Sequence, residues 1–316
     1  MILGLDIGGA NTKAASSDGL FAESVYLPLW KRAPLGETLQ RFAELEPEGV
    51  AVVMTGELAD CFSSKREGIE SIMAVVQRAF SCPVHFWGAG GFGWKDPLEL
   101  AGANWSASAA LLSREVGDCL FVDMGSTTTD IIPIKGEPLA ARTDYLRLAR
   151  GELVYTGLLR TNLGALLPWV RIRGDCIPLA PEFFAITADA YLALGEISEE
   201  RYTCDAPDGA GKSRAAVLQR LARTVCADLE ELGEFGALAI AMQVRDRQMN
   251  ILTDALEKQV KKHCLTQVVA AGIGENPVAE AARFLGLECH PLSKKYGRVV
   301  SDVFPAYAVA RLLEIA

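Results

Sequence analysis

Apolar runs that end in short polar turns recur along the chain, and the clearest of them covers residues 120–134. Leu120 to Val122 is apolar, Asp123 follows, and a turn of glycine and hydroxyl residues leads into the largely apolar stretch Ile131 to Ile134. This pattern predicts a strand, a tight turn and a second strand. Such a turn can direct backbone N–H groups and hydroxyls at an anion, and an acid at the strand tip can hold a metal ion.

Residues 3–13 repeat this pattern at the N-terminus. Asp6 aligns with Asp123, 117 positions later, and three further pairs align in the same register: Gly8 with Gly125, Gly9 with Ser126, and Thr12 with Thr129. One turn of this kind is usually only structural, but two copies in register indicate two similar lobes that face one ligand. No further copies follow, which argues against a short-period solenoid. We therefore predict phosphate contacts from Gly8, Gly9, Ala10, Asn11, Thr12, Gly125, Ser126, Thr127 and Thr128.

The segments between the two copies predict a compact α/β lobe over residues 1–112. Asp18-Gly19 is a hairpin signal, and residues 37–45 and 69–80 have helical patterns. Residues 50–54 form a continuous apolar run, as expected of a strand buried on both faces, and residues 83–87 predict another strand.

Two places in this lobe are candidates for substrate contact. Glu57 lies in a polar loop after the strand at 50–54, and ligands gather at the carboxyl ends of parallel strands. A solvated loop acid is an equally consistent interpretation of Glu57. Asn104 and Trp105 begin a helix of small residues that leads into the second lobe, and both can line a pocket.

Residues 113–316 predict a second lobe with a helical insertion. We expect a third strand at 139–142 and helices at 187–195, 214–232 and 235–263, the last of these with a break. Arg160, in a polar and aromatic segment, is a candidate anion contact, although an arginine is more often a surface charge. The chain ends with an apolar strand that enters a glycine turn at 267–275, a helix at 277–285, and a last helix at 306–313 that should return toward the first lobe.

One apparent phosphate motif is rejected. Residues 208–213 resemble the end of a P-loop, but the motif requires glycine where Ala206 stands and an apolar strand before it. A polar loop that caps the helix beginning at Arg214 explains these residues better, although Lys212 can still point into the cleft.

Composition narrows the function classes. The 316 residues carry a formal net charge of −9, which argues against nucleic acid as a partner. The apolar run at residues 1–5 is too short for a signal peptide or a membrane span and leads directly into the first turn, so we expect neither. We therefore expect a cytoplasmic protein with small-molecule partners and no membrane or nucleic-acid partner, of unknown oligomeric state. The eight cysteines are scattered without a Cys-x-x-Cys pair, so reduced thiols are expected rather than disulfides or zinc ligands.

Taken together, these segments resemble the superfamily of actin, Hsp70 chaperones and sugar kinases (the ASKHA fold). Residues 6–13 and 123–130 stand where its two phosphate loops lie, and residues 270–275 stand where its adenosine motif lies. The chain more narrowly resembles the hydantoinase/oxoprolinase-like proteins of the tetrahydromethanopterin-linked one-carbon pathway, through residues 6–13, 54–58, 103–105 and 123–130. The resemblance implies an α/β fold of two ribonuclease-H-like lobes around a central cleft, with Gly272 and Gly274 as ligand contacts.

Archaeal members of that group are transferases of methanofuran biosynthesis. The resemblance implies that (aminomethyl)furan-methyl diphosphate condenses with the phenol of a γ-glutamyltyramine- or tyrosine-type acceptor and releases diphosphate with Mg²⁺. Asp6 and Asp123 would hold Mg²⁺ and Lys13 would neutralise phosphate charge, so these three are the candidate catalytic residues. Asp130 and Glu57 are candidates for the base that accepts the phenol proton.

The glycine motif departs from the superfamily pattern, because Ile273 separates Gly272 from Gly274. A bulky side chain there can fill the space of an adenine, which favours a smaller diphosphate ligand. Two alternatives stay open: an ATP-dependent kinase or ATPase that uses the same turns, and a non-catalytic nucleotide-binding protein. The product of turnover (diphosphate, ADP or none) distinguishes the three.

Overall fold

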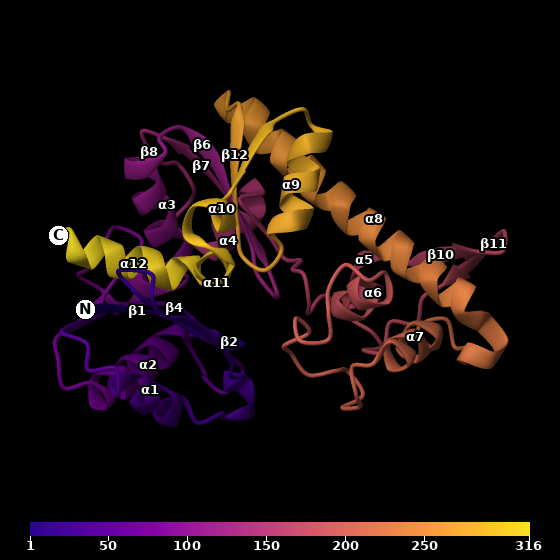
Figure 1. Cartoon of the computed structure of the whole chain (residues 1–316), viewed down its shortest axis with the longest axis horizontal. Helices are drawn as coiled ribbons and strands as arrows, with labels where there is room; N and C mark the ends of the chain where they lie inside the picture. Colours follow the sequence, from indigo (N-terminus) through magenta and orange to yellow (C-terminus); the bar gives the residue numbers. More distant parts are fainter.

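The computed structural model describes residues 1–316 and contains two large β-sheets, one in each lobe (Figure 1). The first sheet has the strand order β3-β2-β1-β4-β5, with β1 (Ile2–Gly8), β2 (Asn11–Ser16), β3 (Ala22–Tyr26), β4 (Gly49–Thr55) and β5 (Val84–Phe86). The second has the order β13-β12-β6-β7-β8, and β9 also pairs with β7; its strands are β6 (Cys119–Met124), β7 (Thr129–Lys135), β8 (Glu137–Pro138), β9 (Leu153–Val154), β12 (Gln267–Ala271) and β13 (Glu288–Pro291).

The two sheets share one topology. In the first, β1 pairs antiparallel with β2 and parallel with β4. In the second, β6 pairs antiparallel with β7 and parallel with β12. The aligned acids Asp6 and Asp123 therefore occupy equivalent places on β1 and β6, as the repeat predicts.

Helices cover the sheets on both faces. The helices of the first lobe are α1 (Leu35–Ala43), α2 (Lys65–Ala79) and the short η1 (Leu29–Lys31) and η2 (Pro97–Leu100). The second lobe has α4 (Asp144–Arg150), α9 (Glu275–Phe284), α10 (Leu292–Tyr296) and α11 (Arg298–Asp302). Two more, α3 (Asn104–Glu115) and α12 (Phe304–Glu314), lie between the two sheets (Figure 1).

The side chains of β4 alternate between two apolar cores, one on each face of the first sheet. Val50 and Val52 of β4 face α1 and α2, whereas Ala51 and Val53 face a second core that also contains Phe121 of β6. Buried residues of α3 and α12 fill this second core, so one apolar layer joins the lobes. The last helix thus returns to the first sheet, where a Cβ on Gly4 of β1 would lie 1.8 Å from the carbonyl oxygen of Ala306.

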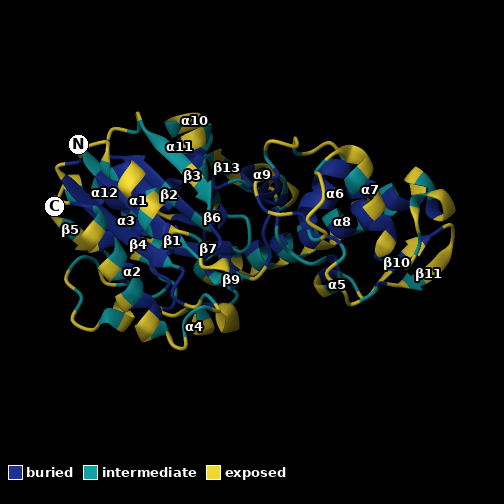
Figure 2. Cartoon of the chain, turned by 90° about the horizontal axis from the view of Figure 1, so that it is seen from below, coloured by how far each residue is buried: buried dark blue, intermediate teal, exposed yellow.

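A helical module extends from the second lobe (Figure 1 and, turned by 90°, Figure 2). It consists of α5 (Leu163–Leu166), the hairpin β10 (Trp169–Ile172) and β11 (Asp175–Pro178), α6 (Thr187–Ala193) and α7 (Arg214–Arg223), arranged along one end of the long α8 (Leu229–His263). Its buried side chains are continuous with the core of the second sheet.

The structure corrects two expected elements. Residues 139–142 do not form a strand: the last ladder bond to β7 is donated by the Leu139 N–H to the Pro133 carbonyl (2.9 Å), and the Ala141 N–H donates to Glu152 Oε2 (2.7 Å) instead. The helix expected at 214–232 ends at Arg223, because Cys226 adopts a positive φ of 58° and Asp228 caps a new helix through the Glu231 N–H. The expected break lies at Gly233, ahead of the segment 235–263 rather than inside it.

The other expected strands and helices are present, with ends that differ by a few residues. All eight cysteines are free thiols, as expected. No helix combines the length and the apolarity needed to cross a bilayer. The positions 112 and 113 both fall within α3, so the boundary between the lobes stays a prediction.

Candidate active site

The first turn joins β1 to β2 and exposes backbone to the cleft. At Gly8 a Cβ would lie 2.9 Å from the carbonyl oxygen of Asn11, so only glycine fits the tight turn. At Gly9 a Cβ would meet nothing within 4 Å, which leaves open space beside the backbone. The turn can therefore be approached closely by a ligand.

The second turn joins β6 to β7 and is hydrogen-bonded through its backbone to the segment 156–161. The N–H of Leu158 donates to the carbonyl of Gly125 (3.0 Å), and the N–H groups of residues 159 and 160 donate to the carbonyl of Ser126 (3.1 and 2.9 Å). A Cβ on Gly157 would lie 2.5 Å from the Ser126 carbonyl carbon, so the two segments are in backbone contact. Because residues 158–160 satisfy these carbonyls on the side away from the cleft, the hydroxyl side chains of the turn can face the cleft.

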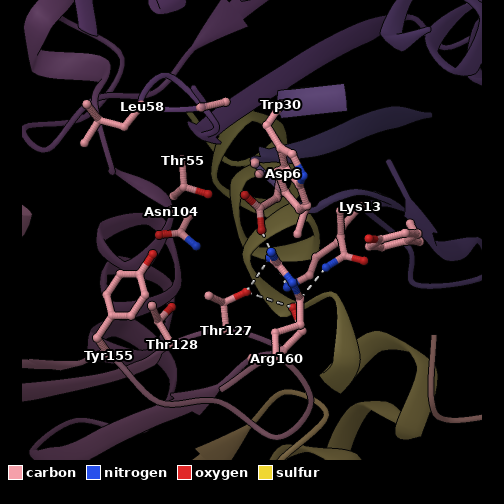
Figure 3. Close-up of a pocket in the computed structure, with 18 of the residues that line it drawn as sticks. Asp6, Lys13, Trp30, Thr55, Leu58, Asn104, Thr127, Thr128, Tyr155 and Arg160 are labelled. Atoms are coloured by element: carbon pink, nitrogen blue, oxygen red, sulfur yellow. Dashed lines mark hydrogen bonds and ion pairs between the residues drawn. The ribbon is translucent and has the colours of Figure 1, made fainter. Parts of the chain in front are cut away.

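The two turns meet. Asn11 Nδ2 donates to Ser126 Oγ across the cleft (3.0 Å), which joins residues 115 positions apart. Both turns line a cavity of about 680 Å³ between the lobes (Figure 3). The shared-cleft expectation therefore agrees with the geometry.

Most residues predicted for the site line this cavity: Asp6, Gly8, Gly9, Ala10, Asn11, Lys13, Glu57, Asn104, Asp123, Gly125, Ser126, Thr127, Thr128, Asp130 and Arg160. Four do not: Thr12, Trp105, Gly272 and Gly274. Thr12 is buried on the face of β2 opposite Lys13. Gly272 and Gly274 pack against Asp123 and Met124. A ligand contact from these four stays a prediction that the cavity does not support.

The two repeated acids have different partners. Asp6 Oδ2 lies 3.7 Å from Lys13 Nζ, and the same cross-strand position opposite Asp123 is Asp130. Burial raises the pKa of Asp6, and Lys13 opposes the rise. Burial also raises the pKa of Asp123 to about 7; Lys13 lowers it, and Asp130 and Asp6 raise it further. Burial disfavours the charge of Lys13, but Asp6 and Asp123 outweigh this and raise its pKa.

Asp130 is held by a residue that no motif in the sequence singles out. Arg147, from α4, donates to Asp130 Oδ1 and to Asp144 Oδ1 (2.6 Å), and its guanidinium lies over the Trp105 ring at 5.0 Å. Trp105 is therefore a buried support behind the cavity wall. An arginine in a short helix carries no sequence signal for this role, and here it is the one buried residue of α4.

The opposite wall contains the predicted Arg160 and, beside it, Trp30, Lys31, Tyr26 and Asp205, which were not predicted from the sequence. Arg160 Nη1 donates to Thr127 Oγ1 (3.0 Å), and its guanidinium stacks on Trp30 of the first lobe at 4.5 Å (Figure 3). Asp205 accepts hydrogen bonds from Lys31 (2.7 Å) and from the Tyr26 hydroxyl (3.0 Å). Both contacts bridge the lobes, and only the tertiary fold brings these partners together. Lys212 lies outside the cavity, where its Nζ donates to the Tyr202 carbonyl (2.6 Å).

The donor set is compatible with Mg²⁺ that arrives with a phosphate. One oxygen of Asp6 and one of Asp123 are buried without a hydrogen-bond partner. No group of three or more His, Cys, Asp or Glu side chains is arranged as a metal cage. Mg²⁺ is commonly held by one or two carboxylates together with substrate phosphates. The two acids fit that mode, and Lys13 adds positive charge beside them.

Comparisons with known proteins place the chain among relatives. Residues 48–316 match the family model described as hydantoinase/oxoprolinase. The chain is 40% identical to a Methanocaldococcus jannaschii protein, the (4-{4-[2-(gamma-L-glutamylamino)ethyl]phenoxymethyl}furan-2-yl)methanamine synthase. The alignment spans 324 residues and covers 99% of this chain and 98% of that protein. It is 33% identical to the Methanococcus vannielii synthase of the same name over 62% of this chain and 91% of that protein.

Solved structures show the fold. A ROK family glucokinase from Streptomyces griseus, in complex with glucose and AMPPNP, aligns with all of this chain and 99% of its own at a TM-score of 0.51 and 13% identity. An acetone carboxylase chain aligns with 98% of this chain and 70% of its own at a TM-score of 0.52 and 11% identity. The two-lobed fold of the sugar kinases and actin-like ATPases is thereby confirmed.

Proposed function

Because the chain belongs to the hydantoinase/oxoprolinase family and matches a furan-methanamine synthase along almost its full length, we propose that it is a transferase of methanofuran or methylofuran biosynthesis. It joins the phenol oxygen of a γ-glutamyltyramine- or tyrosine-type acceptor to the methylene of an (aminomethyl)furan-methyl diphosphate. The observation that carries the proposal is the 40% identity over 99% of the chain. The product named for that relative contains the phenoxymethyl ether that this reaction forms.

The cavity chemistry supports this reaction. The bond between the furan methylene and the diphosphate oxygen breaks, and the electron pair leaves with diphosphate. A lone pair of the phenol oxygen forms the new C–O bond, and the phenolic proton is released to solvent or first to a cavity carboxylate. The furan ring can spread positive charge at the methylene, so the main requirement is to stabilise the leaving anion.

The chain's own residues meet that requirement at the turns. Ser126, Thr127 and Thr128 present hydroxyls beside the backbone N–H groups of the second turn, and Asn11 presents an amide from the first. Lys13 and Arg160 supply positive charge on the same wall (Figure 3). Mg²⁺ held by Asp6 and Asp123 would supply further charge neutralisation when bound. The hydrogen bond between Asn11 and Ser126 keeps the turns close enough to share one diphosphate.

Of the two candidate bases, Asp130 already accepts from Arg147. This ion pair stabilises the ionised carboxylate, so Asp130 is a weaker base than burial alone would make it. Glu57 has one carboxylate oxygen without a hydrogen-bond partner.

The test is a product assay. Purified protein is incubated with Mg²⁺, the furan-methyl diphosphate and γ-glutamyltyramine, and the ether is measured by mass spectrometry beside released diphosphate. A parallel reaction replaces tyramine by tyrosine in the acceptor, and another contains ATP without the furan. We expect one diphosphate for each ether and no ADP. ADP production without ether formation would replace the proposal with the kinase or ATPase alternative.

A further inference from the structure

The cavity contains more acids than its cations can neutralise. It is lined by seven acidic residues and four basic ones; the acids are Asp6, Glu57, Asp60, Asp123, Asp130, Asp144 and Asp205. Four of the acids are occupied: Asp6 lies beside Lys13, Asp130 and Asp144 share Arg147, and Asp205 binds Lys31. Asp123 lies within the charge field of Lys13, next to the turns. Asp60 is exposed. Glu57 is left as a buried acid without a cationic partner.

The burial of Glu57 is built into the fold. Its side chain lines the cavity, the residue is 2% exposed, and Oε2 has no hydrogen-bond partner. Helix α2 packs onto its backbone, where a Cβ on Gly68 would lie 2.2 Å from the Glu57 carbonyl oxygen. Burial raises the pKa of Glu57, and Lys65 only partly opposes the rise, because no ion pair joins the two side chains. Burying an ionised carboxylate without a partner costs free energy of folding, and a bound ligand with a positive charge would offset that cost.

Glu57 also lies close to the first turn along the sheet. Thr55 of β4 pairs with Gly8 of β1, so Glu57 lies two residues beyond the strand position that adjoins the first turn. The intervening Gly56 is in close contact with Gly8: a Cβ there would lie 3.1 Å from the Gly8 carbonyl oxygen. In Figure 3 the neighbouring Leu58, Thr55, Asn104 and Tyr155 lie on one side of the cavity, and Trp30, Lys13 and Arg160 lie on the other. The segment that carries Glu57 thus lines the side of the cavity away from Lys13 and Arg160.

We propose that Glu57 forms a subsite for a primary ammonium group, and that its ligand is the aminomethyl arm of the furan donor. This inference rests on the proposed function, because the amine comes from the furan-methanamine part of the product named for the relative. The ammonium and the reacting methylene are on opposite sides of one small ring. Glu57 would bind the first while the turns bind the diphosphate on the second, which fixes the ring between them. Glu57 is then a binding residue and not the base.

The proposal predicts selectivity for the donor. The test compares the aminomethyl donor with a donor that carries methyl in place of aminomethyl, in the wild type and in Glu57→Gln. We expect Glu57→Gln to raise KM for the aminomethyl donor on the order of 10- to 100-fold, as for loss of a buried charge-assisted contact. KM for the methyl donor should change by less than about threefold. Glu57→Asp, which keeps the charge, should retain part of the selectivity.

The controls separate this role from a structural one. Glu70→Gln makes the same change on the exposed side of α2, outside the cavity, and should leave both KM values unchanged. A structural defect in Glu57→Gln would weaken both donors equally. Equal effects on the two donors, or no effect on either, would overturn the subsite while leaving ether synthesis intact.

A binding measurement decides the case if the wild type forms no ether. Furfurylamine and 2-methylfuran are titrated into the wild type and Glu57→Gln by calorimetry at pH 8, where the amine is largely protonated. The subsite predicts that only furfurylamine binds and that Glu57→Gln abolishes this binding. If furfurylamine binds both proteins equally, or neither, the subsite is wrong. Absence of ether in the wild type with furfurylamine bound at Glu57 would overturn the proposed reaction alone.

Discussion

Asp6 and Asp123 are equivalent by position and unequal by environment. Each lies near the end of a central strand, but its cross-strand neighbour is a lysine in the first lobe and an aspartate in the second. Asp6 therefore has an ion-pair partner in Lys13. Burial raises the pKa of Asp123 to about 7; Lys13 opposes this rise from a distance, and Asp130 and Asp6 add to it. Asp123 gains more from an added cation than Asp6 does.

This difference predicts unequal effects of removing the charge. Asp123→Asn should reduce turnover by on the order of 10²-fold or more, and Asp6→Asn somewhat less, because each loses charge that would hold Mg²⁺ against the leaving diphosphate. Steady-state rates over a range of Mg²⁺, with thermal melts of both variants, provide the measurement. Asparagine caps a turn as well as aspartate does, so normal turnover in two folded variants would mean that these acids only cap their turns.

A second residue-scale prediction concerns stability and pH. Burial raises the pKa of Glu57 from 4.5 to about 7, so the folded protein binds this proton more tightly than the unfolded chain does. Stability from this group is complete below pH 4.5 and is lost as pH rises toward 7. Glu57→Gln should therefore stabilise the protein at pH 8 by about 1–3 kcal/mol, with a difference that shrinks toward pH 5. Urea unfolding at both pH values measures it; a difference independent of pH would contradict the assignment.

At the residue scale the sequence predicted the groups that belong to the repeat. The aligned acids, the aligned glycines and Ser126 line one cavity because register on equivalent strands dictates their place, whereas the aligned pair Thr12 and Thr129 is buried outside it. Arg147, Trp30 and Asp205 were missed, since their roles depend on partners that only the tertiary fold brings near. The glycines at 272 and 274 were selected by family resemblance, and the structure uses them to pack β12 against β6.

At the scale of elements, the segment 156–161 determines the shape of the second turn. It donates three backbone N–H groups to the turn from below, and it is itself fixed by Gln248 of α8, whose Nε2 donates to Thr156 Oγ1 (2.7 Å) and to the Gly157 carbonyl (2.9 Å). Gln248 is fully buried and accepts from the Tyr191 hydroxyl (2.7 Å). The long helix thereby supports a turn that belongs to the cavity.

Gly157→Ala should accordingly disturb the site more than its size suggests. The new Cβ would lie 2.5 Å from backbone atoms of Ser126 and Thr127, so the turn must move. We expect a stability loss of about 1–3 kcal/mol and a fall in turnover of at least about tenfold. Gly36→Ala is the matched control, because its Cβ would have an ordinary contact at 3.9 Å inside helix α1. Equal activity of the two variants would show that the turn tolerates displacement.

Element types were predicted well where periodicity was strong, and ends were predicted poorly. The strand expected at 139–142 was apolar enough, but pairing with β7 stops after Leu139, and the Ala141 N–H bonds to the Glu152 side chain. The helix expected over 214–232 has continuous helical composition, and a local positive φ at Cys226 divides it. Both errors come from local backbone features. Hydrophobic periodicity and helix propensity are averaged over many residues and do not detect such features.

At the scale of the whole molecule, the two lobes share a core. Helices α3 and α12 lie between the sheets, and their buried residues contact strands of both. Opening or closing of the cavity must therefore slide or tilt the sheets over these helices. The shared layer also explains why the last helix packs on the first strand, at the other end of the chain.

Gly4→Ala tests this shared layer. Its Cβ would lie 1.8 Å from the Ala306 carbonyl oxygen, so α12 must shift away from β1. We expect a loss of about 2–4 kcal/mol, with one cooperative unfolding transition in both proteins, because the layer couples the lobes. Gly49→Ala, on the neighbouring strand β4, meets a flexible side-chain end at 3.3 Å and should lose less. Two separate transitions in the calorimetric scan of the wild type would show that the lobes unfold independently.

The packing of α12 on β1 also brings the two ends of the chain together, on the side of the molecule away from the helical module (Figures 1 and 2). Ser17 Oγ donates to Glu314 Oε1 (2.7 Å) close to this place. A short linker from Ala316 to Met1, with new ends opened at the exposed turn around Gly209, would give a circular permutant that keeps every strand pair and the cavity. The same fold would then form although the segments follow one another in a different order along the chain.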